Sequence, residues 1–208
     1  MIEVRDVFQV KFGKIDQAVD LFKRLHKISP PHAESSVHYH VLTDVSGPMY
    51  TLVTEFVVQT LGEWETTSQK ILNATGFTDW FKEFQLLIDG GRREFYTIEG
   101  PCEDWSHSGV VVVRQNYRAL KWQIRPAVAL LQRYGALLTA FGVGRNPRIL
   151  TDMSGQMFQA VIEIETDDLA GWEDKRRTLF READFQAWFM QLRSGVEAGA
   201  HEFYRVEA

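Results

Sequence analysis

Hydrophobic and polar positions alternate along this chain with two different periods, one typical of strands and one of helices. Residues 2–12 interleave β-branched and aromatic residues with polar ones, which predicts a strand. Residues 15–25 place apolar side chains at i, i+3, i+4 and i+7 spacing, which predicts an amphipathic helix. Pro30-Pro31 forbids its continuation. The same criteria predict strands at 37–43, 49–58 and 93–99. Between the last two strands they predict a helical stretch at 61–87, which Gly76 can interrupt and which Gly90-Gly91 ends.

The second half of the chain repeats this order. The pattern predicts a strand at 109–117, a helix at about 120–137, hairpin strands at about 139–151 and 156–166, helices within 168–195 and a strand at 200–207. Pro126 falls inside the helical pattern, where it should kink the helix or stand in its first turn. Each half therefore reads β-α-β-β-α-β, the ferredoxin-like order.

The two halves are copies of one sequence. When the chain is shifted by 108 residues, 19 of the 58 positions from 42 to 99 are identical, without a gap. Upstream, Phe12 fits Tyr117, so we expect an offset of 105 there. The acidic stretch 100–104 has the composition of a linker. We therefore predict an α+β protein with one ferredoxin-like repeat at 1–103 and a second at 104–208.

Several repeated motifs resemble a known family. They are Leu61-Gly62-Glu63-Trp64-Glu65, Phe77-Thr78-Asp79-Trp80-Phe81 and Glu94-Phe95-Tyr96, with their copies between Leu169 and Tyr204. This combination resembles the NIPSNAP-like branch of the dimeric α/β-barrel superfamily. The resemblance implies that the two repeats place their sheets face to face and close one barrel within the chain, with the helices outside. Relatives in that superfamily include cofactor-free monooxygenases, isomerases, haem-binding enzymes and stress-response proteins, so the fold does not select a function.

Composition and charge narrow the choice of function. Of 208 residues, 45% are hydrophobic and 25% charged, with a net charge of −5 and scattered Lys and Arg. Nucleic-acid binding, which needs a basic face, is therefore disfavoured. No apolar run approaches the roughly 20 residues of a membrane span. The acidic N-terminus does not resemble a signal peptide, and Cys102 stands alone, so we expect a cytoplasmic protein without a cysteine-based metal site.

Two glutamates are the foremost catalytic candidates. Glu55 and Glu163 occupy matched positions in mid-strand, on the sheet face that alternation turns away from the helices. A buried carboxylate needs a partner or a raised pKa, and either makes an acid or base. The alternative is a structural ion pair with Arg5, Lys11 or Arg114 across the sheets. The repeated Glu94-x-Tyr96 motif is more typical of architecture.

The candidate ligand-binding residues lie on the same mixed face and on the neighbouring strand. They are Arg5, Gln9, Arg114, Asn116, His38 and His40. The two histidines at i, i+2 could share a metal, but their matches are Asn146 and Arg148 and no third ligand is evident, so we assign no metal. Positions where the halves differ, such as His40/Arg148, are where an asymmetric site should lie.

Three functions fit these features. The first is a small-molecule binder that takes an apolar or aromatic ligand into the barrel, acting as a cofactor-independent monooxygenase or isomerase. There, Glu55 or Glu163 would be the base, and Arg5, Arg114 or Asn116 would stabilise the developing anion. The second is a non-enzymatic, stress-related homo-oligomer that pairs through its sheet edges. The third is a haem-binding barrel, for which no haem motif is present. We predict no cofactor, and leave open whether the protein is an enzyme.

Overall fold

The computed structural model describes residues 1–28 and 39–208, and each half has the order β-α-β-β-α-α-β. The first half contains β1 (Ile2–Val10), α1 (Ile15–Ile28), β2 (Tyr39–Ser46), β3 (Thr51–Val58), α2 (Leu61–Leu72), α3 (Phe77–Gln85) and β4 (Ile88–Ile98). The second contains β5 (Val111–Ala119), α4 (Ile124–Ala140), β6 (Arg145–Asp152), β7 (Gln159–Thr166), α5 (Leu169–Leu179), α6 (Ala183–Gly195) and β8 (Val196–Val206).

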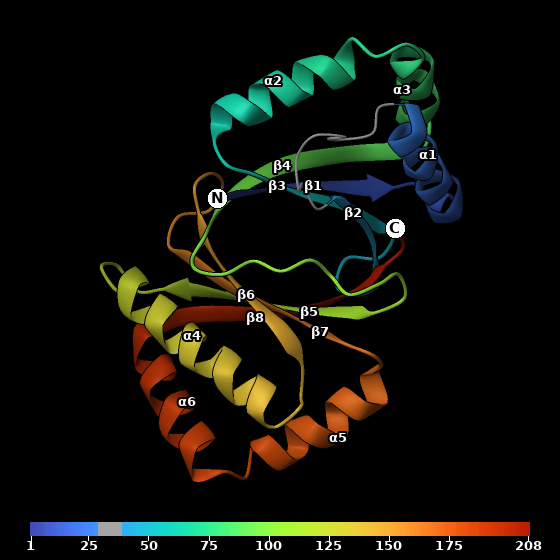
Figure 1. The fold of residues 1–208 in the computed structure, drawn as a ribbon. Coiled ribbons are helices and arrows are strands. Elements are labelled where there is room, and N and C mark those ends of the chain that lie inside the picture. The colour runs from blue at the N-terminus through green and yellow to red at the C-terminus, as the bar shows by residue number, and fades with distance from the viewer. Residues whose placement is uncertain (29–38) are drawn as a thin grey trace.

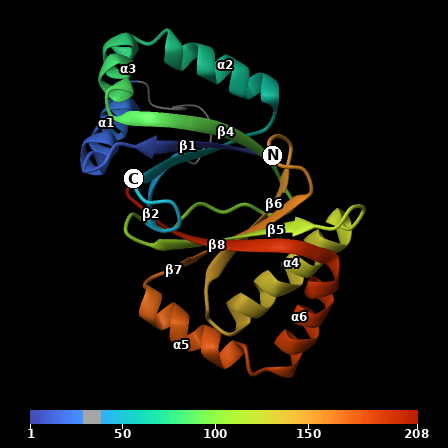
Figure 2. The same cartoon turned by 180° about the vertical axis from the view of Figure 1, so that it is seen from behind.

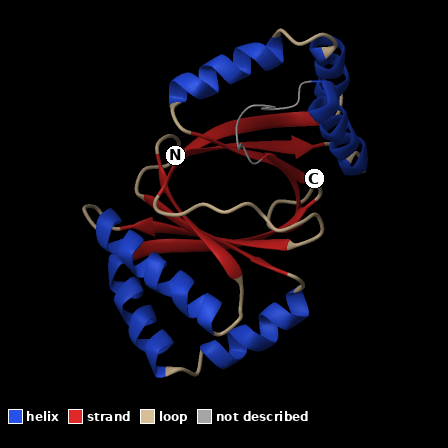
Figure 3. Ribbon diagram, viewed as in Figure 1, coloured by secondary structure: helices blue, strands red, loops and turns tan. Residues whose placement is uncertain are grey.

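The strands of both halves close one antiparallel barrel in the order β1-β3-β2-β8-β5-β7-β6-β4. Two short seams join the halves: residues 96–98 of β4 pair with residues 150–152 of β6, and residues 42–46 of β2 pair with residues 203–206 of β8. Each half contributes four consecutive strands to this order. Figure 1 shows the two sheets face to face, and Figure 3 shows the helices outside them. The chain therefore has the predicted fold, tandem ferredoxin-like units in a dimeric α/β barrel.

Each half has its own core between helices and sheet, and the two cores correspond. Trp80 of α3 packs on Phe22 and Phe84, and its indole N–H donates to the carbonyl of Leu21 at 2.7 Å. Trp188 of α6 donates to the carbonyl of Leu130 at the same distance. The repeated motif at 77–81 and 185–189 is thus a packing motif that connects the last helix of each unit to its first. None of the described helices combines the length and apolar character needed to span a membrane.

The expected offset of 105 at the first strands is wrong. Arg5 lies opposite Glu55, whereas Arg114 lies opposite Glu163, so the structural offset is 109. With this offset Gly13 and Trp122 occupy matched positions of the two units, and both have a positive φ, of 71° and 70°. A short strand can be aligned at several registers by hydrophobicity, and pairing with the neighbouring strand decides among them.

Gly90 and Gly91 also differ from expectation, because they lie inside β4 and do not end a helix. Helix α3 has already ended at Gln85. A Cβ on Gly91 would lie 2.8 Å from Cδ1 of Phe8 on the paired strand, so the ring needs the space that glycine leaves. Two other expectations hold: Gly76, with φ 92°, separates α2 from α3, and Pro126 lies in the first turn of α4.

The two indole hydrogen bonds predict matched losses of stability. In Trp80→Phe and in Trp188→Phe, a helical carbonyl loses the hydrogen bond from the indole and a small cavity opens, so each variant should lose about 1–3 kcal/mol of unfolding free energy. Chemical denaturation measures this. The control is Phe81→Ala, whose ring is half exposed and which should lose less than about 1 kcal/mol. Equal losses in all three variants would contradict the role assigned to the indole N–H groups.

Candidate functional site

The inner face of the first sheet holds one arginine between two glutamates. Arg5 on β1 lies opposite Glu55 on β3 and Glu94 on β4. Its Nε donates to Oε1 of Glu55 at 3.2 Å, and NH1 donates to Oε2 of Glu94 at 3.2 Å. Cross-strand neighbours on one face of a sheet lie within reach of one another, so the strand register alone assembles this group.

The second sheet repeats the arrangement. Arg114 on β5 lies opposite Glu163 on β7 and Glu202 on β8, and its NH1 donates to Glu163. Each arginine also lies over a tyrosine of the other unit: Arg5 is 5.1 Å from the ring centroid of Tyr204, and Arg114 is 5.0 Å from that of Tyr96. These cation–π contacts connect the two sheets.

A third arginine breaks the symmetry between the sheets. NH1 of Arg148 on β6 donates to Oε2 of Glu3 at 2.8 Å and lies 3.9 Å from a carboxylate oxygen of Glu55 and of Glu163. All of these side chains are at most 2% exposed. We refer to six residues as the ionic cluster: Arg5, Arg114, Arg148, Glu3, Glu55 and Glu163.

The three glutamates of the ionic cluster have different acidities. Burial, together with the charges of Glu163 and Glu55, raises the pKa of Glu3 to about 8. Burial and Glu55 likewise raise the pKa of Glu163, against the attraction of Arg114. Burial opposes ionisation of Glu55 too, but Arg5 and Arg148 outweigh it and lower its pKa. Glu3 therefore carries a proton at neutral pH, and Glu55 carries a negative charge.

The carboxylates of Glu3, Glu55 and Glu163 each place one oxygen within 4.8 Å of the others. Three acidic oxygens at this spacing could hold a cation. The neighbouring guanidinium of Arg148 instead supplies positive charge to all three, and Arg5 and Arg114 supply more. The arrangement is that of an ion-pair network in which each buried charge has an opposite neighbour.

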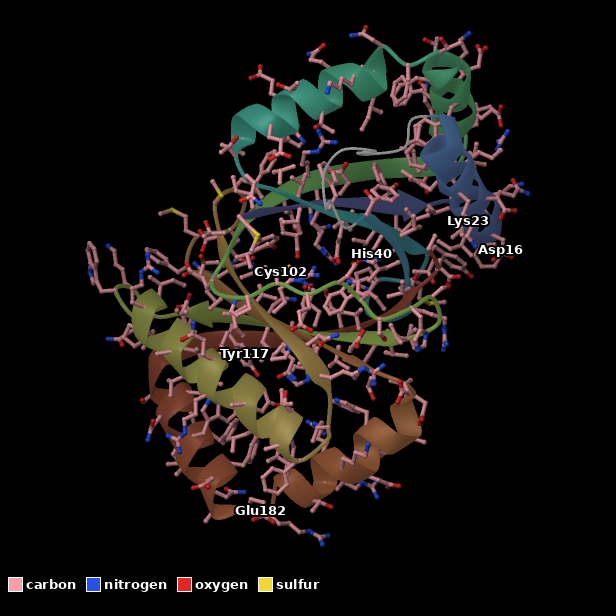
Figure 4. The ribbon with its side chains drawn as sticks, viewed as in Figure 1. Asp16, Lys23, His40, Cys102, Tyr117 and Glu182 are labelled. Carbon is pink, nitrogen blue, oxygen red and sulfur yellow. The ribbon has the colours of Figure 1, made fainter. Side chains whose placement is uncertain are left out.

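One side of the barrel is crossed by the segment that joins the halves, residues 99–110, which contains the predicted domain boundary. Its Trp105 is buried, lies 4.2 Å from the guanidinium carbon of Arg148, and places Nε1 3.5 Å from Oε2 of Glu55. The neighbouring Asp104 pairs with His40. Figure 1 shows this segment running across the front of the barrel, and Figure 4 shows His40 and Cys102 between the two sheets. The segment thus covers the ionic cluster.

The other side of the barrel has a pocket of about 310 Å³. It lies between the inner faces of β4 and β5 and the first half of β8, and Figure 2 shows β4 and β8 on the side turned to the viewer. Arg5 and Arg114 line it, so it reaches the ionic cluster. We call it the Arg5–Arg114 pocket; its other lining residues are Arg92, Glu94, Tyr96, Asn116, Tyr117, Arg118, Gln156, Gln159, Ala198, Gly199, Ala200 and Glu202.

A second pocket, of about 360 Å³, is the counterpart of the first under the duplication. Its residues Val7, Gln9 and Gly90 correspond to Asn116, Arg118 and Ala198. We call it the twin pocket; its lining residues are Val7, Phe8, Gln9, Pro48, Thr51, Asp89, Gly90, Gly91, Arg92, Glu202 and Tyr204. The two pockets share Arg92 and Glu202, so they adjoin.

The predicted site residues fall into three groups. Arg5, Arg114 and Asn116 line one pocket. Gln9 lines the twin pocket, where its side-chain amide donates to the carbonyl of Met49 at 2.7 Å. The others lie elsewhere.

His40 lies on the opposite side of the barrel from the pockets, and burial lowers its pKa despite Asp104. His38 lies outside the described residues. Glu55 and Glu163 line neither pocket and form ion pairs with Arg5 and Arg114, the arrangement that the sequence offered as an alternative to a catalytic base. Lys11, the third basic residue considered for these ion pairs, does not join them, because its ammonium donates to the carbonyl of Leu86.

Four important residues were not among the candidates: Glu3, Trp105, Arg148 and Arg118. Arg148 could have been found, because it stands where the first unit has His40, and both lie opposite the repeated glutamate. Glu3 and Trp105 gave no signal, since neither has a polar or aromatic copy in the other unit.

Neither a protein-family model nor a curated protein matches this sequence. Solved structures do match its fold. A Fusobacterium nucleatum protein named "putative monooxygenase" aligns over 100% of this chain and 92% of its own, with a TM-score of 0.74 and 11% identity. A haem-binding protein from Thermus thermophilus aligns over 99% of this chain and 90% of its own, with a TM-score of 0.61 and 10% identity. At these identities the likeness is one of fold.

A NIPSNAP domain protein from Burkholderia xenovorans matches 45% of this chain and 90% of its own, with 21% identity and a TM-score of 0.40. The dimeric α/β-barrel fold is therefore established by full-length neighbours, and the NIPSNAP name stays a resemblance of motifs.

The raised pKa of Glu3 predicts a pH-dependent stability. The folded-state pKa of about 8 exceeds the unfolded value of about 4.3, so the folded protein binds more protons between these pH values. The stabilisation is complete below the lower value and is lost as the pH rises through the upper one, by up to about 1.4 kcal/mol per pH unit. Relative to Glu3→Gln, the wild-type protein should become steadily less stable from about pH 5 to about pH 8.

Urea denaturation of both proteins across that range provides the measurement. Glu83→Gln is the control, because Glu83 is exposed and pairs with Arg24 at the surface. A stability difference between wild type and Glu3→Gln that does not change with pH would mean that Glu3 is ionised throughout.

Proposed function

We propose that this protein binds a small planar organic molecule in the Arg5–Arg114 pocket. The observation that carries this proposal is a pocket of about 310 Å³ that leads from solvent to two almost fully buried arginines. Pockets of a few hundred Å³ with convergent polar groups are typical of ligand sites. The sequence predicts an inner face that mixes polar and apolar groups, and the pocket lining has both, so we propose a ligand with an apolar ring and a polar end directed toward the arginines.

We further propose that the reaction, where one takes place, is of the cofactor-independent monooxygenase or isomerase class. Both classes pass through an anion formed when a substrate loses a proton, and fixed cationic groups in a low-dielectric site stabilise such an anion. Arg5 and Arg114 would have this role, and the carboxylate of Glu202, which lines the pocket, would accept the proton. A monooxygenase reaction would take its oxygen atom from molecular oxygen. Glu55 and Glu163 would hold the two arginines in place, because neither carboxylate lines the pocket.

Haem binding is a weaker proposal for this pocket. No described histidine, cysteine or methionine lines it, so those axial ligands are not in position. Homo-oligomerisation and a cytoplasmic location stay predictions. The edge segments 89–93 of β4 and 197–201 of β8 are exposed and would be the strands that pair with another chain.

Crystallographic screening with mono- and bicyclic aromatic fragments tests the proposed site. We expect bound fragments to gather in the Arg5–Arg114 pocket, and Ala198→Leu, which fills it, to weaken their binding about tenfold or more in calorimetric titrations. The matched control is Gly90→Leu at the corresponding position of the twin pocket, where an added Cβ meets no atom within 4 Å. Fragments absent from the pocket, or binding equally to both variants, would overturn the proposal.

A further inference from the structure

The walls of the Arg5–Arg114 pocket and of the twin pocket differ in charge. The first has four arginines against two glutamates among its lining residues, namely Arg5, Arg92, Arg114 and Arg118 against Glu94 and Glu202. The twin pocket has one arginine against two acids, namely Arg92 against Asp89 and Glu202. The duplication has therefore left two pockets at related positions whose lining residues carry net charges of opposite sign, although Arg118 also pairs with Glu197 at 2.6 Å.

Two carboxylates of the ionic cluster beside the first pocket hold their protons more strongly than usual. Glu3 carries a proton at neutral pH, and burial together with Glu55 raises the pKa of Glu163 as well. Glu55, Glu94 and Glu202 therefore supply most of the negative charge that faces Arg5 and Arg114. Glu94 is shared between two arginines: its carboxylate lies 3.2 Å from Arg5 and 2.7 Å from Arg92, so it does not neutralise Arg5 by itself.

Donor groups also remain without acceptors. NH2 of Arg5 is buried and has no hydrogen-bond partner among the described residues. The half-buried side-chain amide of Asn116 forms no hydrogen bond within the same part of the chain. A buried guanidinium nitrogen without an acceptor costs free energy, which an anionic ligand would recover.

We propose that the ligand of the Arg5–Arg114 pocket is an organic anion, a carboxylate, phenolate or enolate on a planar ring, and that the twin pocket does not take it. This inference rests on the proposed function and adds the charge of the ligand to it. The anionic group lies toward Arg5 and Arg114, and Asn116 and Arg118 contact it from β5. In the twin pocket, Val7 stands at the position of Asn116 and Gln9 at that of Arg118. The amide of Gln9 already donates to the carbonyl of Met49, and Arg92 is the one cation among the described lining residues.

Titration calorimetry with 2-naphthoate and its neutral analogue 2-naphthamide tests the charge preference. We expect 2-naphthoate to bind at least about tenfold more tightly, which corresponds to ~1.4 kcal/mol, and to lose affinity at high salt because part of the attraction is screened. Crystals soaked in each probe locate the binding site.

Two variants with the same chemical change separate the pockets. Asn116→Asp adds a negative charge to the Arg5–Arg114 pocket and Gln9→Glu adds one to the twin pocket, each with little change in shape. Asn116→Asp should weaken 2-naphthoate binding about tenfold or more and leave 2-naphthamide binding almost unchanged. Gln9→Glu should affect neither. Circular dichroism and denaturation midpoints confirm that both variants fold.

The outcomes distinguish the two proposals. Equal affinity for acid and amide, with both probes seen in the pocket, would overturn the anion proposal and leave the ligand site intact. A loss of 2-naphthoate binding in Gln9→Glu but not in Asn116→Asp would also overturn it, by placing the anion in the twin pocket. Aromatic fragments absent from the Arg5–Arg114 pocket would overturn the proposed function itself.

Discussion

Three arginines buried inside one barrel impose a constraint that the rest of the structure satisfies. A guanidinium stays charged at any physiological pH, so Arg5, Arg114 and Arg148 need carboxylates and aromatic faces within a few ångströms. The carboxylates come from the glutamates, and the aromatic faces come from Tyr96, Tyr204 and Trp105. The sheets must therefore face each other in one register, because a slip by one residue would turn an arginine outward and leave its partners buried alone.

The duplication explains why the cluster is nearly symmetric, and its divergence explains why the two sides of the barrel differ. Arg5 and Arg114 are copies, but Arg148 stands where the first unit has His40. Arg148 recruits Glu3 and the ring of Trp105, which brings the joining segment over one side of the barrel. The opposite side of the barrel, at β4 and β8, is not covered by this segment and contains the two pockets. A few differences between the copies thus make the two sides of a nearly symmetric barrel unlike.

The solved structures with a similar fold restrict the possible functions of this protein less than the lining of its pocket does. Proteins with this barrel include one named as a "putative monooxygenase" and one that binds haem, and both share only about a tenth of their residues with this chain. Fold supplies the enclosed space between two sheets, and the side chains that line it supply the chemistry. Here the lining side chains include four arginines, on which the proposal of a ligand with a charged end rests.

The sequence by itself determined the duplication, the order of the elements and the face on which Arg5, Glu55 and Glu163 lie, because these depend on periodicity and on comparison of two copies. Only the tertiary structure decided which charges meet. Arg148 and Glu3 lie 145 positions apart and come together because the barrel closes between units. The register of β1 against β5, the cover formed by Trp105 and the pockets on the β4–β8 side likewise depend on contacts between distant segments, which no local pattern encodes.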